Sequence, residues 1–146
     1  MASRIRNVIA PLFVFLLTSI KLTVLSPSEK SCAITANATK AREFFEKTLG
    51  LQFESEDFAA LVFRVGGSML RIQKVKEVRK AQYTSLGWEV EDIHASVKQL
   101  RASGVVFQRY EGVEQDEDNV WGSPSGAQVA WFEDPDGNIL SLTQFK

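Results

Sequence analysis

Histidine and cysteine, the two residue types most often used in nucleophilic and metal chemistry, are scarce in this chain. It has one histidine, His94, and one cysteine, Cys32, among 146 residues. His94 follows Glu91 in a segment predicted to be helical, and Cys32 lies in a short run typical of a buried strand. Neither a Ser-His-Asp nor a Cys-His set is therefore available for nucleophilic catalysis. With a single cysteine, no disulfide can form within the chain.

The densest group of carboxylates lies in a long polar segment, residues 110–126. We favour a solvated acidic loop there, and the alternative is a loop that closes over a binding site and brings one carboxylate to a ligand. Trp121 lies in the same segment beside a run rich in Gly, Ser and Pro, and it is the aromatic residue that we expect to flank a ligand. The acidic residues of the segment are Glu111, Glu114, Asp116, Glu117 and Asp118.

The composition is that of one folded globular domain. Hydrophobic residues make up 45% and charged residues 24% of a chain that is long enough to bury a core. The formal net charge of −1 supplies no basic field, so nucleic acid is not an expected partner.

The first 28 residues differ in character from the rest. Arg4 and Arg6 precede an almost wholly apolar run at residues 8–20, which is the pattern of a secretory signal peptide and is too short to span a bilayer comfortably. Cleavage after Ser28 would leave a domain of residues 29–146. A signal peptide implies export, whereas a misassigned start would leave the protein cytoplasmic. In a third interpretation the segment is an extra strand or helix packed on the domain.

The remaining sequence predicts the same order of elements twice. In the first half, residues 31–76, Phe44 and Phe45 lie on the apolar face of a helix that Gly50 ends as a left-handed cap. The predicted strands of this half are residues 31–36, 51–54, 58–65 and 68–74.

The second half, residues 83–146, repeats this pattern. A helix beginning at Glu91 places Ile93 and Val97 on one face, and Gly104 ends it. Each half offers a curved sheet with an apolar face and a helix, and pairing the halves leaves a concave space for a small molecule. The predicted fold is α+β with two modules of the βαβββ type. Extended segments of the second half are residues 84–90, 105–107, 127–133 and 139–144.

Three segments resemble signatures of the vicinal-oxygen-chelate superfamily of glyoxalases, bleomycin-resistance proteins and extradiol dioxygenases. KAREFFEKTLGL at residues 40–51 resembles the first helix, and GWEVEDI at 87–93 resembles the strand–helix junction of the second half. VAWFEDPDGNILSL at 129–142 resembles the closing hairpin, in which the DPDGN turn is read as structural. The resemblance implies two βαβββ modules that form a curved mixed sheet around a small-molecule cup, and it implies a homodimer.

Relatives that use a metal hold it with side chains of the type His or Gln, Glu, His and Glu from four strands. The resemblance aligns these positions with Lys30, Arg71, Ser85 and Ser141 of this chain. Two cations and two hydroxyls do not make an ordinary divalent-metal site, because the ligands must supply lone pairs and usually negative charge. No cofactor is therefore predicted, and the alternative is a divalent metal held by other residues.

Because successive side chains of a strand point to opposite faces, the aligned positions also predict which neighbouring residues line the cup. If Arg71 points inward, its charge must be satisfied by an ion pair with Glu89, which we favour, or by an anionic group of a ligand. Trp88 and Trp131 are predicted to be core residues. The residues predicted to bind ligand are Arg71, Gln73, Ser85, Glu89, Trp121 and Ser141.

Two functions are compatible with this site. The first is a metal-free binder of a small molecule, similar to the bleomycin-resistance proteins. The second is a glyoxalase- or dioxygenase-like lyase or isomerase, in which Arg71 and Glu89 act as electrophile and base. A structural or regulatory interaction module has no positive support in the sequence.

Overall fold

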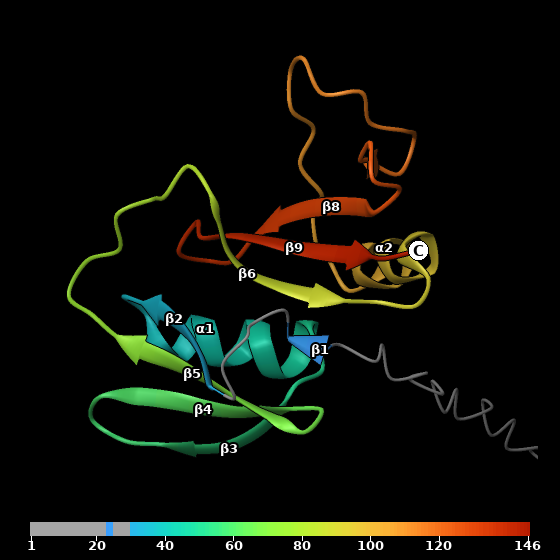
Figure 1. The fold of residues 1–146 in the computed structure, drawn as a ribbon. Helices are drawn as coiled ribbons and strands as arrows, with labels where there is room; N and C mark the ends of the chain where they lie inside the picture. The colour runs from blue at the N-terminus through green and yellow to red at the C-terminus, as the bar shows by residue number, and fades with distance from the viewer. Residues whose placement is uncertain (1–22, 25–29) are drawn as a thin grey trace, which may run out of the picture.

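The structure, a computed structural model, describes Thr23–Val24 and residues 30–146 (Figure 1). These residues form an N-terminal sheet with the strand order β2-β5-β4-β3 and a C-terminal sheet with the order β1-β6-β9-β8-β7. The first module consists of β2 (Lys30–Thr35), α1 (Ala38–Glu43) continued by a π-helical turn (Phe44–Thr48), β3 (Gln52–Glu56), β4 (Ala60–Val65) and β5 (Ser68–Lys74). The second consists of β6 (Thr84–Glu89), α2 (Ile93–Ala102), β7 (Trp121–Gly122), β8 (Gln128–Glu133) and β9 (Ile139–Gln144), with β1 (Thr23–Val24) added at its edge.

The two sheets repeat one topology. In each sheet the first strand of the module lies parallel to the last, β2 to β5 and β6 to β9. The remaining pairs, β5 with β4, β4 with β3, β9 with β8 and β8 with β7, are antiparallel. Both modules are therefore βαβββ units, and the predicted α+β fold is confirmed.

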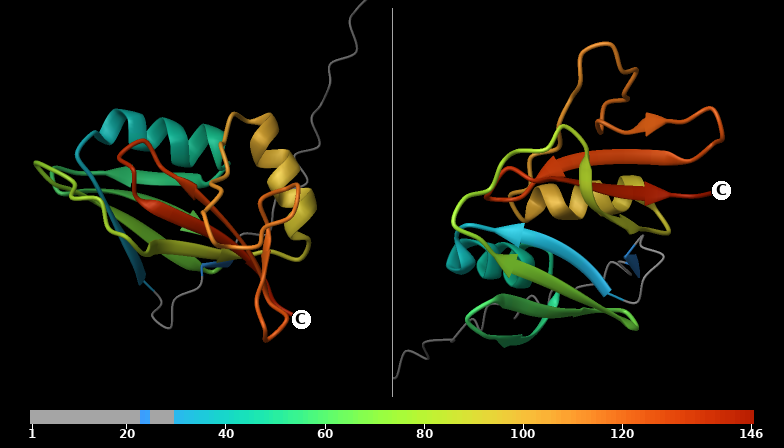
Figure 2. Two further views of the ribbon diagram at one scale, coloured as in Figure 1. Left: turned by 90° about the horizontal axis from the view of Figure 1, so that it is seen from above. Right: turned by 60° about the vertical axis from the view of Figure 1, so that its left-hand side comes forward.

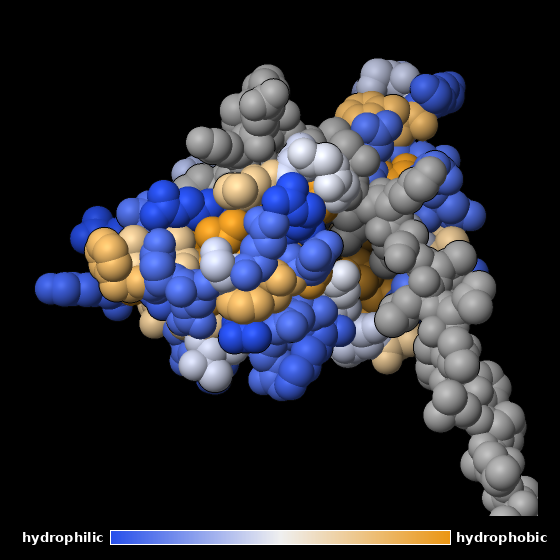
Figure 3. Space-filling view, turned by 90° about the horizontal axis from the view of Figure 1, so that it is seen from below, coloured by the Kyte–Doolittle hydropathy of each residue, from blue (hydrophilic) through white to orange (hydrophobic). Residues whose placement is uncertain are grey.

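Each sheet is covered by a helix on one face only. In the left view of Figure 2 both helices lie above the strands. The strand residues turned toward the helices are buried, as the alternating burial along β4 and β5 shows for Leu61, Phe63, Leu70 and Ile72. The opposite faces carry no helix of the described residues, and they are where polar strand residues lie. Seen from below, the surface shows apolar patches separated by hydrophilic side chains (Figure 3).

One core joins the two modules. Phe45 of the first helix packs on Phe63, and its neighbour Phe44 lies 6.4 Å, ring centroid to ring centroid, from Phe132 of β8. Trp88 is fully buried and stacks on Phe132 with a centroid distance of 6.3 Å, which confirms its prediction as a core residue. Burial of such aromatic side chains is worth roughly 1.5–3 kcal/mol each and is the main force that closes the two modules on each other.

The helices differ from expectation at their ends. The predicted first helix changes to a π-helical turn at Phe44 before Gly50 ends it with a φ of +72°. The second helix begins at Ile93 rather than at Glu91, because Asp92 is its N-cap and accepts a hydrogen bond from the Ala95 amide at 2.9 Å.

The strands also differ from expectation, most of them by one or two residues at an end. The strand predicted at residues 58–65 begins at Ala60, because the Asp57 carboxylate accepts hydrogen bonds from the amides of Ala59 and Ala60 and extends the turn. The segment predicted as a loop at residues 110–126 contains the short strand β7.

The predictions for residues 1–28 lie outside the described residues, except at Thr23–Val24. These two residues pair antiparallel with β6, Thr23 opposite Glu89 and Val24 opposite Trp88. Within the described part of the chain, neither helix has the length and apolar character needed to cross a membrane.

Candidate functional site

The helix-free face of the C-terminal sheet presents three rows of side chains, because residues in register on neighbouring strands point to the same side. The middle row is Gly87, Ser141 and Trp131. The rows beside it are Glu89, Thr143, Val129 and Trp121, and Thr84, Ile139 and Glu133. These residues are called here the open face of the C-terminal sheet. It brings together three of the predicted ligand-binding residues, Glu89, Trp121 and Ser141.

Ser85 does not follow the alternation expected of it. The pairing of β6 with β9 shifts between Thr84 and Leu86, so Ser85 lies in an irregularity of the strand. Thr84 is the residue in register with Ile139, and its hydroxyl accepts a hydrogen bond from Nε1 of Trp131 at 3.2 Å. Ser141 lies in a regular part of β9 and is buried.

Trp131 is the centre of a half-buried aromatic group outside the core, and its prediction as a core residue is wrong. Its neighbours Ala130 and Phe132 occupy the core side of β8, which leaves Trp131 half-buried on the open face. The Trp121 ring lies 6.0 Å from the Trp131 ring at an interplanar angle of 32°. The Tyr110 ring lies 5.7 Å from it at 80°, edge to face. These three residues are called here the aromatic shelf.

Backbone contacts hold the aromatic shelf in place. The Gln108 amide donates to the Trp131 carbonyl at 2.7 Å, which sets the path of the chain before Tyr110. The Tyr110 amide in turn donates to the Gln115 side chain at 2.7 Å. Trp121 is fixed by its pairing with Val129. Each of the three rings is therefore held in place by contacts with β8 or with the Gln115 side chain.

A carboxylate lies beside the shelf. Glu133 is two residues beyond Trp131 on β8 and points to the same side of the sheet. Burial, and secondarily the negative charge of Glu133, raise the pKa of the Tyr110 hydroxyl. Lys80 approaches Glu133 at 3.6 Å, but the Lys80 side chain is 68% exposed. An ion pair that is so exposed is strongly screened by solvent, so Lys80 binds Glu133 only weakly.

Arg71 and Gln73 lie on the helix-free face of the other sheet. The residues that alternate with them on β5, Leu70 and Ile72, are buried toward α1, which leaves Arg71 and Gln73 exposed. Arg71 stands between Val62 of β4 and Cys32 of β2 in the strand register.

The predicted ion pair between Arg71 and Glu89 is not formed. Both residues belong to the described part of the chain, both are exposed, and neither pairs with the other. The positive charge of Arg71 acts instead on Asp57. The pKa of that carboxyl is lowered, first by the amides of Ala59 and Ala60 and less by Arg71 and Lys74.

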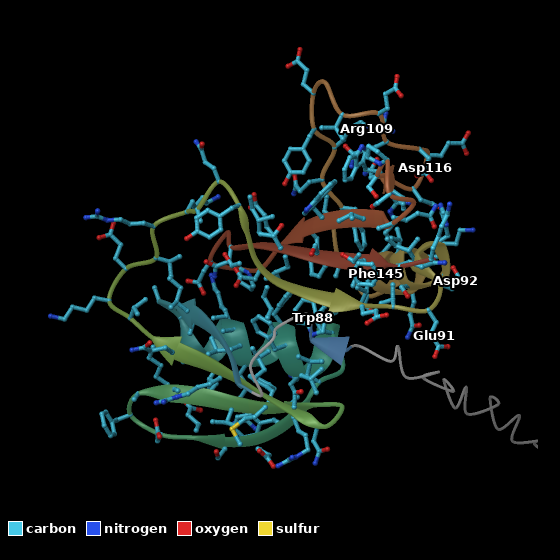
Figure 4. All side chains as sticks on the ribbon, in the orientation of Figure 1. Trp88, Glu91, Asp92, Arg109, Asp116 and Phe145 are labelled. Carbon is cyan, nitrogen blue, oxygen red and sulfur yellow. The ribbon has the colours of Figure 1, made fainter. Side chains whose placement is uncertain are left out.

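The acidic segment is a braced loop rather than a row of free carboxylates. Asp116 contacts Nε2 of His94 at 2.8 Å, and Asp118 contacts Arg101 at 2.9 Å, so α2 anchors the loop at two points. Burial by itself would raise the pKa of Asp116. The hydrogen bonds from His94 and from the amides of Val120 and Asp118 outweigh it and lower that pKa. Asp116 and Arg109 lie well away from β5 (Figure 4).

A model of the Glyoxalase/Bleomycin resistance protein/Dioxygenase superfamily matches residues 30–142, which is most of the chain. The chain belongs to this superfamily. The vicinal-oxygen-chelate resemblance inferred from the three sequence segments is thereby confirmed.

Several solved structures share the fold of this chain. A lactoylglutathione lyase from Agrobacterium tumefaciens is 14% identical with a TM-score of 0.60, and the alignment covers 82% of this chain and 93% of that one. A superfamily member from Sphaerobacter thermophilus is 20% identical with a TM-score of 0.63, covering 83% and 98%. An integron cassette protein from the Halifax Harbour sewage outfall is 23% identical with a TM-score of 0.61, covering 80% and 96%. No curated protein matches the sequence.

The positions that the resemblance aligns with the metal ligands of relatives carry other residue types in this chain. At the corresponding positions stand the guanidinium of Arg71 and the hydroxyls of Ser85 and Ser141, and the side chain of Lys30 lies outside the described part. Within that part, no three His, Cys, Asp or Glu side chains gather in a way that could hold a metal ion. This donor set does not fit a divalent cation, which requires several lone-pair donors and usually negative charge.

Proposed function

We propose that this superfamily member binds a small organic molecule on the open face of the C-terminal sheet, without a divalent metal ion. The observation that carries the proposal is the aromatic shelf beside Ser141. Its large, half-buried rings lie beside Ser141. Ser141 is the last of the four positions aligned with metal ligands, and it offers only a hydroxyl. Aromatic side chains bury much area at little loss of conformational freedom, and each well-placed ring pair adds about 0.5–1.5 kcal/mol.

Polar groups around the shelf supply orientation. Thr84, Ser141 and Thr143 bring hydroxyls to the same face, and Glu89 and Glu133 bring carboxylates to its ends. A few polar groups among apolar surface are the usual make-up of a small-molecule site. Catalysis by Arg71 and Glu89 receives less support, because the two side chains lie on different sheets and form no pair.

The experiment is a binding screen of the full-length protein joined to product analysis. Ligand-induced thermal stabilisation is measured across a panel of small organic molecules, and each stabilising compound is then incubated with protein and followed by mass spectrometry. We expect stabilisation without conversion, and no stoichiometric metal by elemental analysis after purification without chelators. Conversion of a compound, or one tightly held ion per chain, would overturn the proposal in favour of an enzyme.

The variant Trp131→Leu tests the location of this site. Loss of the central ring should weaken binding of each stabilising compound by about tenfold or more, since truncating an aromatic anchor commonly costs over 1 kcal/mol. The matched control is Phe58→Leu, which alters a ring that is 95% exposed at the β3–β4 turn. Equal affinities of wild type and Trp131→Leu would place binding elsewhere.

The protein is further proposed to work as a homodimer. Within the described residues, helices cover only one face of each sheet, and a second copy is the partner that the superfamily resemblance suggests. Size-exclusion chromatography with light scattering is the test. A monomer at micromolar concentration would contradict this part of the proposal.

A further inference from the structure

The aromatic shelf has a defined shape. Trp131 and Trp121 are tilted by only 32°, and Tyr110 stands nearly perpendicular to Trp131 at 80°. The two indoles, on neighbouring strands and with planes inclined by 32°, form a floor, and the upright phenol forms a wall. A flat ring system can lie on such a floor, whereas a branched aliphatic group would contact it at few points.

The rings are held before any ligand arrives. Nε1 of Trp131 donates to the Thr84 hydroxyl at 3.2 Å, which fixes the rotation of the indole. The loop that carries Tyr110 and Trp121 is braced by the Gln115 side chain, which donates to the carbonyls of Gln108 and Asn119 at 3.0 and 2.8 Å. Preorganisation of this kind reduces the entropy lost on binding.

The shelf is also electronegative. The faces of indole and phenol rings carry the negative part of the ring quadrupole. Glu133 lies beside them, and its charge contributes to the raised pKa of Tyr110. The nearest basic neighbour in sequence, Arg109, is engaged by the carbonyls of Gln115 and Asp116, the first at 3.0 Å and the second at 2.6 Å. Lys80 approaches Glu133 at 3.6 Å, but its side chain is 68% exposed, so this pair is screened by solvent. A cation over these rings would be attracted by the rings and would compete with Lys80 for Glu133.

We propose that the aromatic shelf of Tyr110, Trp121 and Trp131 takes a flat aromatic compound that carries a positive charge, such as a quaternised nitrogen heterocycle. Its ring lies on Trp131 and Trp121, and its charge faces Glu133. This inference rests on the proposed function and names the ligand class of the same site.

Three probes of similar shape and different charge test the inference by equilibrium dialysis against the full-length protein. They are N-methylquinolinium, which is cationic, quinoline at pH 8, which is neutral, and 2-naphthoate, which is anionic. We expect the cation to bind about tenfold or more tighter than the anion, with the neutral probe between them. An anion that binds as tightly as the cation would overturn the inference.

Two variants separate stacking from charge. Trp131→Leu should weaken all three probes, because the floor is lost. Glu133→Gln should weaken only the cation, by about five- to thirtyfold, and leave quinoline unchanged. Glu117→Gln, which alters an exposed carboxylate of the acidic loop, is the matched control and should change nothing. A Glu133→Gln variant that weakens all probes equally would contradict the charge assignment.

The inference and the proposed function fail in different ways. If none of the three probes binds while the broad panel yields a non-planar or anionic ligand displaced by Trp131→Leu, the inference is overturned and the proposed function stands. If no compound of either set binds, both are overturned.

Discussion

Asp136, in the turn between β8 and β9, accepts a hydrogen bond from the hydroxyl of Thr35 at the end of β2, 101 residues earlier in the chain. The same carboxylate accepts from the Ala36 amide at 3.0 Å. Asn138 of the turn donates to the Ile34 carbonyl at 2.9 Å. The DPDGN segment is therefore a clasp between the two modules as well as a tight turn.

Asp136→Ala should destabilise the protein by about 1–3 kcal/mol, because it leaves the Thr35 hydroxyl and the Ala36 amide without their acceptor. Urea unfolding followed by tryptophan fluorescence measures the loss. Thr35→Val and the double variant complete a thermodynamic cycle, with a coupling of about 0.5 kcal/mol or more expected. Strictly additive effects would show that the contact contributes nothing to stability.

Asp134, the first residue of the same turn, should make stability depend on pH. Burial raises its pKa above 3.8, against the opposing hydrogen bonds from Asn138 and Asp136. Because its pKa is raised in the folded state, the folded protein keeps this proton up to a higher pH than the unfolded chain does. The contribution of Asp134 to stability is therefore greatest below pH 3.8 and declines as the pH rises toward the folded-state pKa.

The variant Asp134→Asn tests this sign. Its amide stays neutral at every pH, so the loss of stability relative to wild type should be smaller at pH 7 than at pH 4. Denaturant unfolding at the two pH values gives the comparison. A loss that grows with pH would mean that the hydrogen bonds, rather than burial, control this carboxyl.

Asp116→Ala should loosen the acidic loop with little effect on global stability. It removes the contact with His94 and the acceptor for the amides of Asp118 and Val120, each at 2.9 Å. The pair with His94 is partly exposed, so the global loss should be at most about 1 kcal/mol. Amide hydrogen exchange at Val120 should become faster, whereas Glu117→Ala should leave it unchanged. Equal protection in Asp116→Ala would contradict the anchoring role.

Gly50→Ala and Gly67→Ala form a matched pair. An added Cβ meets no atom within 4 Å at either position, but only Gly50 has a positive φ, +72°. Gly50→Ala should therefore destabilise by about 1–2 kcal/mol through backbone strain alone. Gly67→Ala should be neutral or slightly stabilising. The two midpoints of thermal unfolding give the difference, and similar values would refute the assignment.

Local patterns predicted the elements well, because each depended on nearby residues. The burial of Phe45 and Trp88 and the helix end at Gly50 follow from periodicity and from glycine geometry. Trp131 could not be placed in this way, because it lies in a run of apolar residues. Without alternating polar residues, the sequence does not show which face of the strand Trp131 occupies. The roles of Ser85 and Thr84 depend on a shift of strand pairing that only the partner strand β9 reveals.

The site depended on contacts between distant segments, which the sequence does not display. Tyr110 was not singled out because nothing near it in sequence indicates that it meets Trp131. A pairing of Arg71 with Glu89 required knowledge of how the two sheets are arranged. The run of Gly, Ser and Pro beside Trp121 was the one local signal that pointed toward the shelf.

The two-residue strand β1 leaves β6 enclosed by a neighbour on each side. Without Thr23–Val24, β6 would be an edge strand. Its backbone groups near Trp88 and Glu89 would then be unpaired and could pair with a strand of another molecule. A chain that begins at residue 29 would therefore be expected to self-associate through this edge more readily than the full-length chain. The short pairing of Thr23–Val24 with β6 is therefore predicted to limit association between chains.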